Sequence, residues 1–121
     1  MAYNKLFLEH FQNPRNIGSL DNYNADFEAE NESDSDKIRF FLRIEEGRVK
    51  EVSYLVKGCP RIIASCSYIS EKVRGLSLEE IDKLDKNTLR LDLGFDENDF
   101  LCIDLPRYAI SQAIEKYRKN S

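Results

Sequence analysis

The stretch KIRFFLRIEEGRVKEVSYLVK, residues 37–57, decides the fold, because its apolar side chains recur at every second position. Its first half places four apolar residues on one face: Ile38, Phe40, Leu42 and Ile44. Its second half repeats the pattern with Val52, Tyr54 and Val56, after a turn at residues 45–48. A period of two is typical of half-buried strands. The stretch therefore predicts an antiparallel hairpin with strands over residues 37–44 and 49–57.

On both sides of this hairpin, apolar residues recur at the spacing of a helix. Residues 3–12, YNKLFLEHFQ, predict a short helix that ends before Asn13-Pro14. After the hairpin, four apolar residues recur at spacings of four, three and four: Ile62, Cys66, Ile69 and Val73. Ser77-Leu78-Glu79-Glu80 is a capping box that opens a helix through Leu84, and a last apolar stripe runs from Ala109 to Tyr117. Because Pro106 is tolerated only in a first helical turn, we expect the last helix to start no earlier than about Ile103.

Two segments between these elements are less regular. Residues 15–35 are rich in Asn, Asp, Glu and Ser, which favours a loop with one edge strand near residues 26–30. Residues 89–95 are apolar and fit either a helix or an extended segment. The order of helix, two or three strands and several helices predicts an α+β fold, with helices packed on an antiparallel sheet in one domain over residues 1–121.

Composition narrows the possible partners. The chain has 121 residues, with 18 Lys and Arg against 22 Asp and Glu, for a net charge of -4. This balance provides no positive field for phosphates, so we expect no nucleic-acid partner. No apolar run approaches the roughly 20 residues that span a bilayer, and residues 1–10 lack the pattern of a signal peptide. We therefore expect a cytoplasmic protein with no membrane partner.

The three cysteines are an odd number in a chain that we expect to stay inside the cell, which favours metal, sulfur chemistry or burial over disulfides. Cys59 precedes Pro60, a residue suited to the first helical position, so its thiol lies at a helix N-terminus that favours thiolate. Simple burial after Gly58 is the alternative. Cys66 shares the buried stripe and is expected to pack. Cys102 lies near the start of the last helix, where a thiolate role and burial are both open.

The remaining polar candidates are few. Asp34 and Asp36 would point to one side if the first strand of the hairpin extends back over them, and their carboxylates could bind a metal; solvated loop acids are the alternative. His10 lies on an apolar helix face and is expected to pack in the core. The sequence holds no nucleophile elbow, P-loop, C-x-x-C pair or H-E-x-x-H motif, so we do not expect an enzyme.

Four segments taken together resemble the iron-sulfur cluster assembly scaffolds of the IscU and NifU N-terminal type. They are EHFQNPRNIGSLDN (9–22), KGCPRIIASCS (57–67), VRGLSLEE (73–80) and LCIDLPRYAISQAIEKY (101–117). The resemblance runs nearly end to end. It implies a three-stranded antiparallel sheet covered by helices, with a cluster site at one tip.

The resemblance also implies a ligand set in which two positions differ from the family pattern. Family members present Cys-Gly-Asp, Gly-Cys and His-Cys motifs. Here Asp34 stands where the first cysteine belongs, Leu101 replaces the histidine, and Asp36, Cys59 and Cys102 are retained. The implied metal ligands are thus Asp34, Asp36, Cys59 and Cys102, with Cys102 as the sulfur acceptor. Cys66 occupies a place where the family usually has serine.

Three functional hypotheses follow from this resemblance. The first is a scaffold that accepts sulfur from a cysteine desulfurase, holds iron or a labile Fe-S cluster, and serves acceptor apo-proteins. The second is a degenerate relative that acts as an interaction protein without a cluster. The third is a zinc-held sulfur-transfer protein, since zinc accepts mixed sulfur and oxygen ligands. Residues 95–99 lack the Leu-Pro-Pro-Val-Lys element, so a dedicated Hsp70-type chaperone is not expected.

Overall fold

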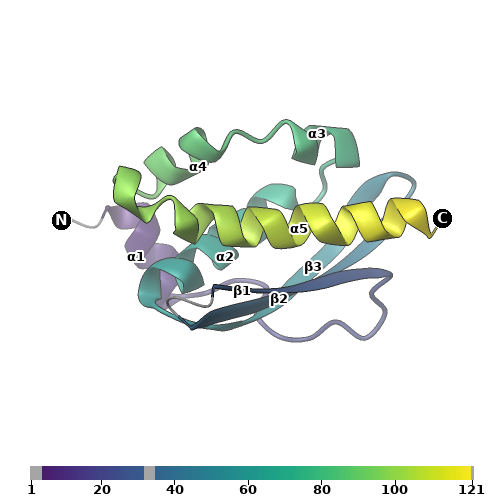
Figure 1. Ribbon diagram of the computed structural model, residues 1–121, viewed down its shortest axis with the longest axis horizontal. Helices are drawn as coiled ribbons and strands as arrows, with labels where there is room; N and C mark the ends of the chain where they lie inside the picture. The colour runs from purple at the N-terminus through teal and green to yellow at the C-terminus, as the bar shows by residue number, and fades with distance from the viewer. Residues whose placement is uncertain (1–3, 32–34, 121) are drawn as a thin grey trace.

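A computed structural model of the protein describes residues 4–31 and 35–120 and has one three-stranded sheet with helices packed on it (Figure 1). The elements in chain order are α1 Lys5–Gln12, β1 Ala25–Asn31, β2 Asp36–Glu45, β3 Arg48–Lys57, α2 Pro60–Val73, α3 Leu78–Asp82, α4 Lys86–Asp92, the 3-10 turn η1 Glu97–Asp99, and α5 Leu101–Lys119. The α+β prediction is confirmed.

The sheet is antiparallel with the order β1-β2-β3, so the predicted hairpin forms its β2-β3 half. The edge strand β1 pairs with β2, and Phe27 lies opposite Phe40. A register shift between Arg43 and Ile44 brings Val49 opposite Ile44. Such a bulge lets Val49 and Val52, which are three residues apart, both reach the core.

Two long helices cover one face of this sheet. In Figure 1, α5 runs along the sheet and α2 lies beside it, with α1 packed on α2 and α4 on α5. The four residues of the predicted α2 stripe are all buried: Ile62, Cys66, Ile69 and Val73. Gly75 follows α2 with a φ of 88°, the left-handed conformation that suits glycine at a helix end. Of the segment 89–95, which the sequence left open between helix and extended chain, residues 89–92 belong to α4.

The start of α5 corrects one expectation. The helix begins at Leu101, so Pro106 is its sixth residue and lies beyond the first turn. The expected start near Ile103 was wrong because the helix tolerates the proline at the cost of one backbone hydrogen bond, since proline has no N–H to donate to the carbonyl of Cys102. Burial of Pro106 against the core offsets that loss. Cys102 is therefore inside the first turn of α5.

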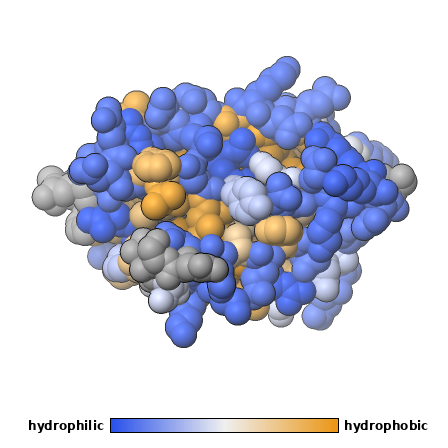
Figure 2. All heavy atoms as spheres, in the orientation of Figure 1, coloured by the Kyte–Doolittle hydropathy of each residue, from blue (hydrophilic) through white to orange (hydrophobic). Residues whose placement is uncertain are grey.

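The surface is mostly hydrophilic, with hydrophobic side chains gathered in a band across the middle of the face shown in Figure 2. Three large apolar side chains near the start of α5 are exposed: Phe100, Leu101 and Tyr108. Among the described residues, none of the helices combines the length and the hydropathy needed to cross a membrane.

Candidate functional site

The candidate site is a pocket of about 450 Å³ at one end of the sheet. Its walls come from the end of β1, the start of β2, the β3-α2 junction, η1 and the first turn of α5. Its lining residues are Asn31, Asp36, Gly58, Cys59, Arg61, Asn98, Asp99, Leu101 and Cys102. The fold thus brings Cys59 and Cys102 into one pocket with Asp36, although the two cysteines are far apart in the chain.

Cys59 and Asp36 are held together by the backbone. Cys59 is the residue before Pro60 at the start of α2, as the sequence predicted, and its backbone N–H donates to Asp36 Oδ1 at 3.4 Å. A Cβ added to Gly58 would lie 2.5 Å from Asp36 Oδ1 and 2.5 Å from Ile62 Cγ2. Glycine is therefore required here, because the β3-α2 junction approaches the carboxylate too closely for any side chain.

Asp36 is not the solvated loop acid that its sequence context favoured. The residue begins β2 and is only 6% exposed. A buried carboxylate is costly unless hydrogen bonds or a cation compensate its charge. Asp34, its expected companion, lies outside the described residues.

For Cys102 the sequence left a thiolate role and burial both open, and the structure favours burial of the thiol. Burial raises the pKa of Cys102 to about 12, its neighbours Cys59 and Asp99 add to the shift, and Arg61 acts in the opposite direction. Cys102 is half-buried, and desolvation outweighs the helix dipole here. The thiol is thus protonated at neutral pH until a cation or a base removes its proton.

An ion pair closes one side of the pocket. Arg61 on α2 lies with its Nε 3.4 Å from Asp99 Oδ1, and Asp99 is the last residue of η1. Asp99 Oδ2 is buried and has no hydrogen-bond partner among the described residues. Sequence reasoning missed both residues, because the chain separates Arg61 from Asp99 and only the packing of η1 on α2 joins them.

Cys66 lies below the site, in the core. Its side chain is fully buried, which confirms the packing prediction for its position on α2. Burial raises the pKa of this thiol well above its ordinary value, and Asp36 and Cys102 add to the effect. Cys66 is therefore near the pocket without lining it.

His10 is a core residue, as predicted. It is 2% exposed, its Nδ1 lies 2.7 Å from Ser67 Oγ, and its Nε2 lies 3.3 Å from Glu71 Oε1. Burial lowers its pKa, although Glu71 opposes the shift. His10 serves to dock α1 on α2. It does not line the candidate pocket that holds Cys59 and Cys102, which we call the cysteine pocket.

The pocket offers two thiols and one buried carboxylate to a soft or borderline metal. Within residues 4–31 and 35–120, no three His, Cys, Asp or Glu side chains lie close enough together to hold a metal ion as they stand. Leu101 places an apolar side chain at the pocket rim.

Comparison with known proteins identifies relatives over almost the whole chain. The family model of the NifU-like N terminal domain matches residues 2–121. The chain is 31% identical to iron sulfur cluster assembly protein 1, mitochondrial, of Debaryomyces hansenii, over 96% of this chain and 68% of that protein. It is 28% identical to the iron-sulfur cluster assembly scaffold protein IscU of Buchnera aphidicola, over 98% of this chain and 97% of that protein. In structure it resembles the N-terminal part of a NifU-like protein from Brucella abortus, with a TM-score of 0.82, 19% identity and coverage of 98% and 95%.

Proposed function

Because the chain belongs to the NifU-like N terminal domain family, we propose that it is a non-enzymatic scaffold of iron-sulfur cluster assembly. The observation that carries the proposal is the meeting of Cys59, Cys102 and buried Asp36 in one pocket at the end of the sheet. The cargo is iron or a labile Fe-S cluster, and zinc fits the same mixed donors. We further propose that residues 1–121 act as one domain in the cytoplasm.

The ligands that we propose are Asp34, Asp36, Cys59 and Cys102. The described donors do not form a group that could hold a metal ion as they stand, so loading requires them to move closer together around the cation. A divalent cation compensates the charge of the buried Asp36 carboxylate. When the cation binds the sulfur of Cys102, it displaces the thiol proton. Two carboxylate oxygens beside two thiolates make a harder donor set than three cysteines, which supports a labile cluster over a persistent one.

Cys102 is the proposed sulfur acceptor, with a cysteine desulfurase as donor and apo-proteins as recipients of the cluster. The Cys102 sulfur attacks the outer sulfur of a donor persulfide, the S–S bond of the donor breaks, and its thiolate leaves with the proton released by Cys102. No oxidant or reductant is consumed. The positive charge of Arg61, which lowers the pKa of Cys102 against the effect of burial, supports the attacking thiolate.

The second candidate is an interaction protein that keeps the fold and binds no cluster. One observation favours it: Leu101, 46% exposed at the pocket rim, cannot ligate a metal at the position where the family has histidine. A dedicated Hsp70-type chaperone remains an unexpected partner in either case.

Anaerobic reconstitution separates the two candidates. The wild type is incubated with ferrous iron, cysteine and a cysteine desulfurase, and its absorption spectrum, iron content and zinc content are measured. We expect bound metal that is lost in Cys59→Ser and Cys102→Ser and retained in Cys66→Ala, the matched cysteine control. The double variant Asp34→Cys with Leu101→His should turn a labile chromophore into a persistent one. If the folded wild type and the double variant both stay colourless and metal-free, the scaffold proposal fails and the interaction protein replaces it.

A further inference from the structure

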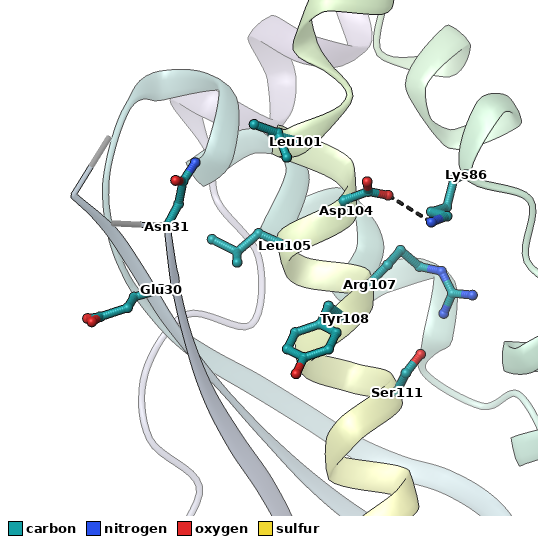
Figure 3. Close-up of a pocket in the computed structure, with 9 residues that line it drawn as sticks. All are labelled: Glu30, Asn31, Lys86, Leu101, Asp104, Leu105, Arg107, Tyr108 and Ser111. Carbon is teal, nitrogen blue, oxygen red and sulfur yellow. Dashed lines mark ion pairs between the residues drawn. The ribbon is translucent and has the colours of Figure 1, made fainter. Parts of the chain in front are cut away.

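A second hollow, of about 680 Å³, lies on α5 next to the cysteine pocket. Its lining residues are Glu30, Asn31, Lys86, Leu101, Asp104, Leu105, Arg107, Tyr108 and Ser111. Figure 3 shows α5 as its floor, the end of β1 on one side and Lys86 of α4 on the other. We call this hollow the α5 groove. It shares Asn31 and Leu101 with the cysteine pocket, so the two hollows are adjacent.

The floor of the α5 groove is an apolar stripe. Leu101, Leu105 and Tyr108 follow one another at spacings of four and three, and they point toward the β1 side in Figure 3. Leu101 is 46% and Tyr108 52% exposed, although the Tyr108 ring still meets the edge of Phe27 with 5.7 Å between centroids. Seven residues of helix rise about 10 Å, the length of about three residues of extended chain. The stripe thus fits a short extended peptide.

The other side of the α5 groove holds a buried cation. Arg107 is only 9% exposed, and its Nη2 donates to the carbonyl of Leu84 at 3.3 Å. Its Nε and Nη1 are buried with no hydrogen-bond partner among the described residues. A buried guanidinium whose donors are unused costs free energy, and an anion is the group that satisfies it best.

The acids nearest to Arg107 are already engaged by other cations. Asp104 pairs with Lys86 at 2.9 Å, and Asp82 pairs with Arg118 at 3.2 Å. Burial lowers the pKa of Arg107 in spite of these two carboxylates. Glu30, the remaining acid of the α5 groove, points away from α5 in Figure 3. Neither Asp82 nor Asp104 accepts a hydrogen bond from Nε or Nη1 of Arg107, so these two donors lack an anionic acceptor among the described residues.

Arg107 shares the α5 groove with an ion pair whose side chains are more exposed than its own. Lys86 and Asp104 flank Arg107 in the α5 groove and also in a neighbouring hollow toward α4. Their side chains are 60% and 30% exposed, and ion pairs that solvent reaches contribute little to stability. A carboxylate from outside can replace Asp104 beside Lys86 with little loss and reach the guanidinium of Arg107.

We propose that the α5 groove docks an extended segment of a partner protein that carries a carboxylate next to two or three apolar side chains. The apolar side chains cover Leu101, Leu105 and Tyr108, and the carboxylate binds between Lys86 and Arg107. Docking here places the flanking residues of the segment over Cys102. The docking surface stands on its own, whereas its use in cargo exchange rests on the proposed function.

The test begins with a displayed library of random heptapeptides selected on the whole wild-type protein. Enriched peptides should combine apolar residues with Asp or Glu, and fluorescence polarisation should give binding at least about tenfold weaker when that acid is changed to its amide. The Tyr108→Ser variant should weaken binding to a similar degree. Leu91→Ser on α4 removes an exposed apolar side chain that does not line the α5 groove, and it should leave peptide binding unchanged.

The same peptides test the link to the cysteine pocket. Amide shifts in nuclear magnetic resonance spectra should map to α5, and bound peptide should slow the alkylation of Cys102 by iodoacetamide. The docking proposal is overturned if no peptide is enriched, if the acid is dispensable, or if Tyr108→Ser binds like the wild type. Binding without protection of Cys102 overturns the link to cargo exchange. The proposed scaffold function is tested separately, by the metal content of the protein measured without peptide.

Discussion

Gly58→Ala is the substitution that tests how the cysteine pocket is built. The new methyl carbon would lie 2.5 Å from both Asp36 Oδ1 and Ile62 Cγ2, well inside van der Waals contact. Both neighbours are buried, and Ile62 is fixed in α2. Overpacking of this kind costs about 1–3 kcal/mol, and displacing Asp36 from the N–H of Cys59 adds to it. We expect a total loss of about 2–3 kcal/mol of unfolding free energy.

Urea denaturation measures this loss directly. With a slope of about 2 kcal/mol per molar urea, the midpoint should fall by about 1 M or slightly more. Gly47→Ala is the matched control, because Gly47 has a φ of 74° and nothing within 4 Å of its added carbon. The control should lose roughly 1 kcal/mol through backbone strain and keep its metal content. A loss below about 0.5 kcal/mol for Gly58→Ala, with metal binding unchanged, would refute the close-approach argument.

Three further predictions concern titratable or buried side chains. Cys66→Ala should cost on the order of 1 kcal/mol in urea denaturation and leave metal content unchanged; loss of metal from the folded variant would make Cys66 a ligand. Because the pKa of Cys102 is raised to about 12, its alkylation by iodoacetamide, followed by mass spectrometry, should be slow at pH 8 and still accelerate above pH 10; a rate that levels off near pH 9 would contradict this. Burial lowers the pKa of His10, so the folded protein favours the neutral imidazole, and the free energy of unfolding should fall as the pH drops below about 6.5. His10→Gln should make the free energy of unfolding depend less on pH in this range. If the variant shows the same dependence as the wild type, His10 is not the group responsible.

The hairpin and α2 could be predicted from the sequence because their apolar periods, two and about 3.6, are local patterns that burial on one face selects. The side of the sheet on which Ile38 and Phe40 are buried followed directly from that period. The start of α5 could not be obtained in this way. The penalty of Pro106 is local, whereas the burial that offsets it depends on the assembled core.

The site was predictable only in part for the same reason. Cys59 and Cys102 stood out by their positions at helix starts, Asp36 by its place before the first strand of the hairpin, and the resemblance joined the three in one ligand set. The pairing of Arg61 with Asp99 depends on tertiary packing and leaves no spacing signal in the chain. The raised pKa of Cys102 likewise reflects desolvation, which the sequence does not display.

Because of the interior proline, the backbone of Cys102 makes one hydrogen bond fewer to the rest of α5. The carbonyl of Cys102 cannot receive the usual donor four residues on, because that residue is Pro106. Helices bend most readily where such a bond is missing. The first turn of α5 is thus the part of the helix held by the fewest backbone hydrogen bonds, and Cys102 belongs to that turn.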